Sequence, residues 1–524
     1  MKFSTALNVS RRRDELDEVA NAKNPVDLVI IGGGITGVGT ALDAVTRGLN
    51  TVLIEKHDLG FGTSRWSSKL AHGGLRYLAK MDFQIAHNSA VERGILMTRT
   101  APHLIHALPQ VTALGADTNL FQKSAIRLGF IAGDLLRVSA GTSSRVLPRS
   151  HYLSPKQTLA LCPEVSRTGL RGAWVNYDGQ MVDDARIVSA IARTAAGHGA
   201  KILTRVEALQ MSAHEVQIRD TLSGQTGVIH ARAVINATGV WAAGLDADIN
   251  IRPSRGTHLI FSAERLGNPR GSLTVPLPGS ISRYLFILPA PHHRVYLGLT
   301  DEDNPGSIPD VPETPEQDID FLLHNINFAL EQPLSRDDVI GTFTGLRPLI
   351  DSGEGGSTAD ISRKHALIRS RDGAFSVVGG KYTEYRLMAE QSLDRVLAES
   401  GISAGACRTR DLPVIGAHRH PDFRGVPRDA LGGLPKPLVR RFGREAPLVA
   451  QAEIARPLEY LDGTDVTRAE VAFALTHEGA MNAADILQRR TRLGLVKDDA
   501  SRVDQEVQEI IAEVAEKENY DVIS

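Results

Sequence analysis

Cysteine, aromatic residues and excess charge of either sign are scarce in this sequence of 524 residues. The two cysteines, Cys162 and Cys407, are too few for a disulfide framework or a metal cluster, so we expect a reducing compartment and no metal centre. A formal net charge of −2 gives no overall attraction to nucleic acid, and we expect no such partner. No apolar stretch is long enough to span a bilayer, and the charged segment 11–18 lacks the apolar region of a signal peptide.

The stretch from Val26 to Lys56 has the pattern of a dinucleotide-binding cradle. Its apolar run 28–31 is typical of a strand buried on both faces. Three glycines follow this run in the spacing G-x-G-x-x-G, namely Gly32, Gly34 and Gly37. They would bring a pyrophosphate to the N-terminus of a helix that ends near Gly48. A plain structural turn is the alternative, and the complete order of strand, turn and helix favours the cradle.

Two further features extend the cradle. A β-rich run delivers Glu55 about twenty residues after the glycines, where a carboxylate can accept both ribose hydroxyls and argues against a 2′-phosphorylated cofactor. Residues 62–77 then combine hydroxyl groups, glycines and cations. Small hydroxyl side chains can hydrogen-bond phosphates and flavin edges, and Arg76 can form a fork with a phosphate ester. A capped turn with surface cations is the alternative, which the nearby cradle disfavours.

These motifs resemble those of a known family. The cradle and the run 67–78, Ser-Ser-Lys-Leu-Ala-His-Gly-Gly-Leu-Arg-Tyr-Leu, are similar to the FAD-dependent glycerol-3-phosphate dehydrogenases, which are respiratory flavoenzymes of the D-amino-acid-oxidase-like superfamily. Further similar runs follow in the family's order at residues 174–186, 233–239, 255–258, 298–301, 344–349 and 377–386.

The resemblance implies an α/β fold with three parts. These are a Rossmann-like FAD-binding domain, an antiparallel-sheet substrate or cap domain, and an α-helical C-terminal domain, preceded by an N-terminal arm. Helical spacing and a capping box at Thr467 and Glu470 also predict the C-terminal helices. The predicted bounds are 1–23 for the arm, 24–95, 165–252 and 345–395 for the FAD domain, 96–164 and 253–344 for the cap, and 396–524 for the helical domain.

The same resemblance implies noncovalently bound FAD and a set of residues that hold it. A glycine turn and helix start at 379–383 would supply N–H groups and a lysine cation to the flavin. The predicted cofactor residues are Gly32, Gly34, Gly37, Glu55, Thr63, Ser67, Ser68, Lys69, His72, Gly73, Gly74, Val206, Ala237, Thr238, Gly239, Gly379, Gly380, Lys381, Tyr382 and Thr383.

In the family reaction, sn-glycerol 3-phosphate loses the proton of its C2 hydroxyl and a hydride from C2, which gives dihydroxyacetone phosphate. The phosphate needs fixed cations, and the proton needs a base near neutral pKa. We expect His258, Arg347 and Lys381 as catalytic residues, because His258 lies in a cap-domain motif whereas His72 belongs to the cofactor segment. A polar residue with only a structural role is the alternative for any one histidine. The predicted substrate-binding residues are Arg76, Tyr77 and Thr300.

The resemblance further implies a membrane quinone as electron acceptor. We therefore expect a cytoplasmic protein bound peripherally to the inner face of the plasma membrane. Two basic stretches, 123–149 and 436–444, are candidates for contact with anionic lipid, and either could instead be an ordinary solvated face. An oxidase that uses O₂ and a non-catalytic flavin scaffold or electron carrier are the alternative functions. The sequence leaves the oligomeric state open, with a homodimer as one candidate.

Overall fold

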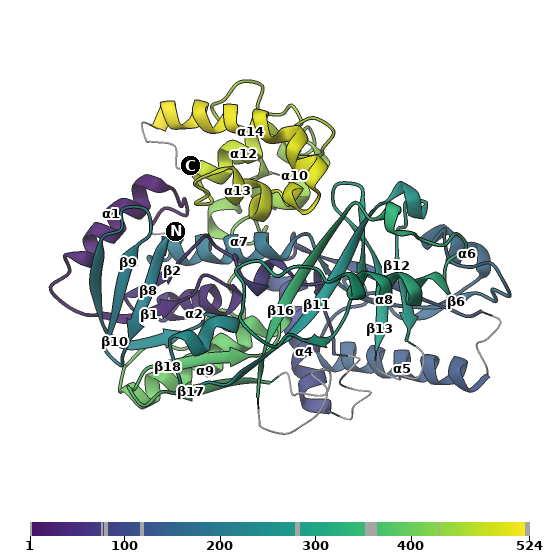
Figure 1. The fold of residues 1–524 in the computed structure, drawn as a ribbon, viewed down its shortest axis with the longest axis horizontal. Helices are drawn as coiled ribbons and strands as arrows, with labels where there is room; N and C mark the ends of the chain where they lie inside the picture. The colour runs from purple at the N-terminus through teal and green to yellow at the C-terminus, as the bar shows by residue number, and fades with distance from the viewer. Residues whose placement is uncertain are drawn as a thin grey trace.

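The computed structural model describes residues 3–518 apart from 75–76, 78–81, 116–119, 278–282, 352–363 and 428. Two β-sheets lie side by side, and a group of C-terminal helices packs across the top of the first sheet and the neighbouring edge of the second (Figure 1). The α/β fold with a cap sheet and a helical C-terminal domain, expected from the sequence, is confirmed.

The first sheet carries the cradle. Its strand order is β17-β18-β10-β1-β2-β7, and strands β18, β10, β1, β2 and β7 run parallel. The apolar run that predicted a doubly buried strand forms β1, in which five of six residues are buried. The strands are β1 (Val26–Ile31), β2 (Thr51–Glu55), β7 (Lys201–Thr204), β10 (Thr226–Asn236), β17 (His365–Arg369) and β18 (Phe375–Gly379), with the hairpin β8 (Val206–Met211) and β9 (Glu215–Asp220) extending β10.

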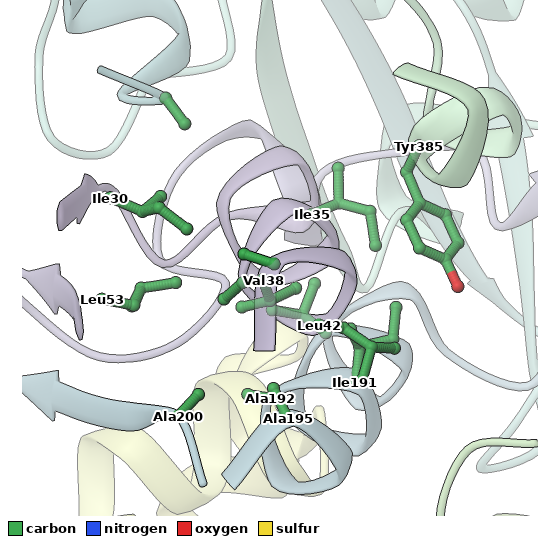
Figure 2. Packing of buried hydrophobic residues seen from close by; sticks show 14 of the residues in the cluster. Ile30, Ile35, Val38, Leu42, Leu53, Ile191, Ala192, Ala195, Ala200 and Tyr385 are labelled. Atoms are coloured by element: carbon green, nitrogen blue, oxygen red, sulfur yellow. The ribbon is translucent and has the colours of Figure 1, made fainter. Parts of the chain in front are cut away.

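The helix that follows the glycines is the centre of the largest core. Helix α2 (Ile35–Thr46) packs its apolar side against β1, α7 (Asp184–Gly197) and α9 (Tyr385–Ser400). Figure 2 shows Leu42 of α2 beside Ile191 of α7, and Val38 between the strand residues Ile30 and Leu53 on one side and Tyr385 on the other. This packing fixes the N-terminus of α2 against the ends of β1 and β2.

The second sheet has ten strands in the order β15-β11-β14-β13-β12-β4-β6-β3, with β16 and β5 at its sides. Its pairs are antiparallel except for β12 with β4. Helices α6 (Pro155–Leu161) and α8 (Glu316–Asn327) contribute to the core on one face. The strands are β3 (Leu70–Ala71), β4 (Ile105–Ala113), β5 (His151–Leu153), β6 (Ala173–Met181), β11 (Ile251–Ser262), β12 (Ser272–Pro276), β13 (Tyr284–Ala290), β14 (Arg294–Gly298), β15 (Glu302–Asp303) and β16 (Gly341–Ile350).

Strand pairing moves the predicted domain boundaries. Strand β6 pairs with β4 over nine residues in the cap sheet, although we had assigned its residues to the FAD domain. Strand β16 pairs with β11 along its whole length, so the third FAD segment begins after Ile350 rather than at residue 345. Helix α9 continues to Ser400, so the helical domain begins after it. Pairing between distant strands is not visible in local periodicity, which explains these errors.

The N-terminal arm is a packed helix rather than a solvated tail. Helix α1 (Val9–Ala20) is capped by Asn8, whose side chain accepts a hydrogen bond from the Arg11 backbone N–H. Arg12 is buried, donates to the carbonyl of Thr204 over 2.8 Å and forms an ion pair with Asp220. The arm therefore covers one side of the first sheet.

The C-terminal helices form a core of their own and attach through buried ion pairs. They include α10 (Lys436–Phe442), α12 (Arg468–Thr476), α13 (Ala483–Asp485) and α14 (Lys497–Glu518), and the capping box predicted for α12 is present. Asp58, in the loop after β2, accepts from Arg490 over 2.7 Å and from Arg489 over 2.5 Å. Because a buried charge is costly without its partner, these pairs hold the domain in one position.

The two predicted basic stretches differ in exposure. Helix α5 (Leu120–Ser139) covers most of the first stretch, and it lies along the lower edge of the molecule, far from the C-terminal domain (Figure 1). In the second stretch, Arg441 is buried in ion pairs with Asp465 and Glu470, and Arg444 donates to the carbonyl of Val426. The structure therefore removes Arg441 and Arg444 from the cations available to lipid.

Candidate FAD and substrate site

One continuous cavity of about 1940 Å³ is lined by both sheets and helix α5. Its lining includes the glycine turn after β1, the end of β2, the turn after β10, and the side chains of His258, Arg347 and Lys381. The cavity therefore has room for a dinucleotide and a small substrate together.

The glycine turn fits a pyrophosphate. Gly32 has a φ of 111°, and a Cβ there would lie 2.7 Å from the carbonyl oxygen of Ala237, so only glycine suits the turn. Gly34 is the N-cap of α2 and has no side chain to occupy the helix N-terminus. The Ile35 N–H donates to Ser64 Oγ over 2.9 Å. A helix N-terminus that faces a cavity without side chains is a favourable place for phosphate.

Glu55 is prepared for the ribose end. Its two oxygens accept the backbone N–H groups of Gly33, over 2.6 Å, and His57, over 2.8 Å. Burial raises the pKa of the Glu55 carboxyl, and the two N–H groups oppose that rise. Because each carboxylate oxygen has a second lone pair, the group can still accept a ribose hydroxyl. Val206, the neighbouring residue of β8, lines the same end.

Most predicted cofactor residues line this cavity. They are Gly32, Gly34, Glu55, Thr63, Ser67, Ser68, His72, Gly74, Val206, Ala237, Thr238, Gly239, Gly379, Gly380, Lys381, Tyr382 and Thr383. The predicted substrate residue Tyr77 also lines it, and Arg76 lies outside the described residues. The segments 237–239 and 379–383 follow the neighbouring parallel strands β10 and β18. The structure thus brings together segments more than 300 residues apart.

Three predicted site residues, Lys69, Gly73 and Thr300, have structural roles instead. Lys69 is buried, and its Nζ donates to Asp184 over 2.8 Å and to two backbone carbonyls. Thr300 is buried, accepts the Thr257 N–H over 3.0 Å and donates to Asp318 over 3.2 Å. Gly73 does not line the cavity and packs closely against the Arg93 guanidinium. Gly37 has the role expected of the third glycine in this spacing, because it lets helix α2 pack closely on the Gly32 carbonyl.

His258 is held rigidly at the cavity wall. Its Nε2 is 2.9 Å from Ser68 Oγ, and its ring stacks on Phe343 with centroids 4.5 Å apart. Gly298 leaves room for the ring, because a Cβ there would lie 2.2 Å from His258 Cδ2. Burial, then the nearby charges of Lys69 and Arg347, hold the pKa of His258 well below its ordinary value. The imidazole is therefore in the neutral form that a general base must have at pH 7.

Arg347 is on strand β16, which pairs with the strand β11 that carries His258. Its Nη1 donates to Ser254 Oγ over 3.0 Å and to Asp301 over 3.3 Å, and its Nη2 donates to the carbonyl of Thr300 over 3.4 Å. Gly256 on the paired strand allows this approach, since a Cβ there would lie 2.3 Å from Nη2. The guanidinium is thus fixed in orientation while it still lines the cavity.

Lys381 stands at the start of the turn that leads into α9. Its Nζ donates to Glu384 over 2.9 Å and to Ser89 Oγ over 2.9 Å, and it lies 3.5 Å from the centre of the Tyr77 ring. Ser89 in turn donates to Glu384. Helix α4 (Phe83–Ile95), which carries Ser89, therefore positions the lysine together with the predicted substrate residue Tyr77.

Several positioning residues were missed from the sequence. Asp184 accepts the Ser67 N–H and hydroxyl as well as Lys69, so it shapes the serine segment. Asp178 accepts the Gly73 N–H over 3.0 Å and Arg93 over 2.7 Å, so it fixes the loop that precedes Arg76. Both acids lie inside the motif 174–186, which was the available signal. Ser89 and Glu384 had no comparable motif.

Comparison with known proteins gives the class first. A family model described as FAD dependent oxidoreductase matches residues 27–382, and the chain is therefore an FAD-dependent oxidoreductase. A second model, described as the C-terminal domain of alpha-glycerophosphate oxidase, matches residues 407–521. The cavity residues described above fit FAD, because the glycine turn, Glu55 and the 379–383 turn lie along one continuous space.

Individual relatives identify the family within the FAD-dependent oxidoreductases. Glycerol-3-phosphate dehydrogenase 1 of Mycobacterium tuberculosis is 53% identical over 96% of this chain and 98% of its own length. The mitochondrial glycerol-3-phosphate dehydrogenase SDP6 of Arabidopsis thaliana is 33% identical over 94% of this chain and 83% of its own length. The chain belongs to the glycerol-3-phosphate dehydrogenase family.

A solved structure shows the same fold. The glycerol-3-phosphate dehydrogenase of Bacillus halodurans, complexed with FAD, aligns with a TM-score of 0.75 over 99% of this chain and 95% of that one, at 24% identity. The L-alpha-glycerophosphate oxidase of Mycoplasma pneumoniae aligns with a TM-score of 0.56 over 74% of this chain and 99% of that one, at 15% identity.

We expect the FAD to be bound without a covalent bond. Neither Cys162 nor Cys407 lines the cavity, and the cradle offers hydrogen bonds to phosphate and ribose instead. Precipitation of the purified protein with acid should therefore release the yellow colour into the supernatant. Colour that stays in the pellet after washing in denaturant would contradict this expectation.

Proposed function

We propose that this protein oxidises sn-glycerol 3-phosphate to dihydroxyacetone phosphate, with transfer of a hydride from C2 to FAD, and passes the electrons to a membrane quinone. The observation that carries the proposal is that His258, Arg347 and Lys381 line the same cavity as the glycine cradle. The names of the relatives support the substrate. The site supplies cations for the phosphate, a base for the C2 hydroxyl, and groups that favour negative charge on the flavin.

Substrate binding requires cations because the phosphate carries nearly two negative charges. Arg347 presents a planar guanidinium whose orientation is fixed by Ser254 and Asp301, and such a group can form two parallel hydrogen bonds to one anion. Lys381 adds a second positive charge near Tyr77. The substrate can then be held in one orientation with its C2 hydroxyl towards His258.

His258 is the base in this account. The neutral imidazole takes the proton of the C2 hydroxyl while C2 loses its hydride, and the positive charge that forms is close to Phe343. Ser68 and the stacked ring keep the imidazole from rotating. When bound, FAD accepts the hydride. The N–H groups of the 379–383 turn and the Lys381 cation favour negative charge at that end of the cavity.

The acceptor distinguishes the dehydrogenase from an oxidase. During turnover in air, the proposal predicts that a soluble quinone analogue is reduced in a one-to-one ratio to the dihydroxyacetone phosphate formed. Hydrogen peroxide should account for only a small part of the electrons. A peroxide yield equal to the product formed, with no effect of quinone on the rate, would favour the oxidase instead.

For access to a quinone, we propose that helix α5 binds the membrane surface. Among the described helices, none is long and apolar enough to cross a bilayer. The outer side of α5 carries large apolar residues at helical spacing, with exposures of 68% for Leu128, 39% for Ile131, 65% for Leu135 and 60% for Val138. Exposed cations lie nearby at Lys123, Arg145 and Arg149. This combination is typical of an interfacial helix on anionic lipid.

Two arginines of the first basic stretch, Arg127 and Arg137, are used within the protein. Arg137 is buried and donates to the carbonyl of Thr142 over 2.7 Å. Arg127 donates to Ser150 over 3.1 Å and lies 4.6 Å from the centre of the Trp174 ring. Arg127 therefore anchors α5 to Trp174 of β6 in the cap sheet, and Arg137 binds the loop that follows the helix.

The double variant Leu135→Asp and Val138→Asp should therefore detach the protein from vesicles containing phosphatidylglycerol. We expect a loss of binding of about tenfold or more, since each buried aliphatic side chain contributes about 1.5–3 kcal/mol. Co-sedimentation measures it. The matched control replaces two exposed leucines elsewhere, Leu222→Asp and Leu448→Asp, and should bind as wild type does. Equal binding by all three proteins would contradict the role of α5.

A further inference from the structure

The cavity extends well beyond the residues assigned to FAD and substrate. Between helix α5 and the cap sheet it forms an arm, lined on the sheet side by residues that share one face of β4, β6, β12 and β13. Phe286 of β13 joins the arm to the catalytic end, because its ring centroid is 6.2 Å from that of His72. The sheet-side residues are Gln110, Thr112, Asn176, Thr274, Pro276, Tyr284 and Phe286.

Polar side chains in the arm have unused hydrogen-bonding groups. Gln110 is only 6% exposed, yet its Nε2 has no hydrogen-bond partner among the described residues. The buried Oγ1 of Thr274 is likewise unpaired within the described part of the chain. Asn176 lies directly opposite Gln110 in the pairing of β4 with β6. Buried polar groups normally have partners, so these two groups are available to hydrogen-bond a bound molecule.

The opposite wall is helical and apolar. The residues that line the arm from α5 are Ala125, Ile126, Leu128, Gly129, Phe130 and Ala132, and Leu128 stands where this side of the helix meets the outer row. Gly129 lies in the interior of this helix, where glycine is unfavourable, and a Cβ there would meet nothing within 4 Å. The missing side chain thus leaves space in the arm. The outer face of the same helix carries the row Leu128, Ile131, Leu135 and Val138.

From this arrangement we infer that the arm is the quinone site. The ring of the quinone would lie between Gln110 and Thr274, which donate hydrogen bonds to its carbonyl oxygens, and the apolar tail would leave past Gly129 to the lipid-facing side of α5. The inference deepens the proposed function and rests on it. A flat ring with two carbonyl acceptors and an apolar tail matches both walls. Gln110, Thr112, Asn176 and Thr274 carry no positive charge for a phosphate, and Arg283, which also lines the cavity, forms an ion pair with Glu302.

The location suits electron transfer from the catalytic end. Asn176 of the arm is two residues from Asp178 along β6, a distance of about 7 Å at the usual rise per residue. Asp178 in turn accepts the N–H of Gly73, in the predicted cofactor segment, so the arm is close to that segment. Oxidation of the substrate alcohol releases two electrons and two protons in all. The quinone takes up two electrons and two protons and becomes the quinol, so the overall reaction balances.

Two variants test the site in the FAD-loaded, full-length protein. Gln110→Leu removes the amide donor and keeps a similar volume, and it should raise the KM for a substituted 1,4-quinone by about two- to tenfold. Gly129→Leu fills the passage and favours the helix. It should raise the KM for a quinone with an isoprenoid tail more than the KM for a tailless quinone. Substrate-driven reduction of a soluble dye should stay at the wild-type level in both.

Matched controls make each outcome decisive. Gln217→Leu changes an exposed glutamine of β9, and Ser124→Leu adds a leucine to α5 at an exposed position that does not line the cavity. Both controls should show the wild-type KM for quinone. If both test variants also keep the wild-type KM, or lose dye reduction to the same extent as quinone reduction, the quinone-site assignment is wrong. The proposed function is not affected by that result. If the wild type reduces no quinone, the acceptor in the proposed function is overturned as well.

Discussion

Replacing His258 with alanine is expected to lower kcat by a factor of about 10²–10⁴, the usual contribution of a positioned base. The KM should change less, because the phosphate is held by Arg347 and Lys381 rather than by the imidazole. Steady-state kinetics with a soluble dye measure this effect apart from the membrane. The flavin content of the variant must equal that of the wild type, since His258 lies on the cavity wall and packs on Phe343.

The pH profile provides a second readout for His258. Burial, Lys69 and Arg347 lower the pKa of the imidazole, so the ring stays neutral when the pH falls below the ordinary pKa of histidine. The acid limb of kcat/KM in the wild type should therefore lie below pH ~6.5, the ordinary pKa of histidine, and should disappear in His258→Ala. His214→Ala, at an exposed turn, serves as the matched control. An unchanged kcat and acid limb in His258→Ala would show that another group is the base, and His72 would be the next candidate.

Arg347→Lys should raise KM and lower kcat together, with a combined loss in kcat/KM of about 10²-fold or more. The ammonium of lysine keeps the charge, but it cannot reproduce a planar fork held by Ser254 and Asp301. An interaction used only for binding would change KM alone. A change in both constants therefore indicates that the guanidinium also acts in the transition state.

The control for Arg347 is on the paired strand. Arg252 of β11 also forms an ion pair with an aspartate, Asp303, but it does not line the cavity. Arg252→Lys should leave both kinetic constants within about twofold of the wild type, because it removes only an exposed ion pair. If Arg347→Lys behaved like Arg252→Lys, the phosphate and the transition state would have to be held by other groups.

The sequence predicted the parts of the site that depend on local order. The glycines after β1, Glu55 after β2 and the Gly379-Gly380-Lys381 turn are each explained by a strand end followed by a turn, and such patterns are visible in one chain segment. His258 and Arg347 were predicted only through the family resemblance. Their proximity follows from the pairing of β11 with β16, where His258 lies opposite Phe343.

Other residues could not be assigned without the three-dimensional structure. Lys69 and Ser68 are adjacent in the sequence, yet Lys69 points into the protein towards Asp184 while Ser68 reaches His258. The hydroxyl of Thr300 is already hydrogen-bonded to Thr257 and Asp318, which belong to other segments of the chain. Charge patterns were equally ambiguous, because Arg441 and Arg137 belong to basic stretches but are buried. Hydrogen-bond partners and burial decide these roles.

The most direct test of the account is an anaerobic titration of the purified protein with sn-glycerol 3-phosphate, followed by a quinone analogue. We expect the oxidised flavin absorbance to disappear at about one equivalent of substrate when the product is trapped, to remain unchanged with glycerol at the same concentration, and to return when the quinone is added. Flavin that stays oxidised in the presence of excess sn-glycerol 3-phosphate, in a protein loaded with FAD, would contradict the proposed function.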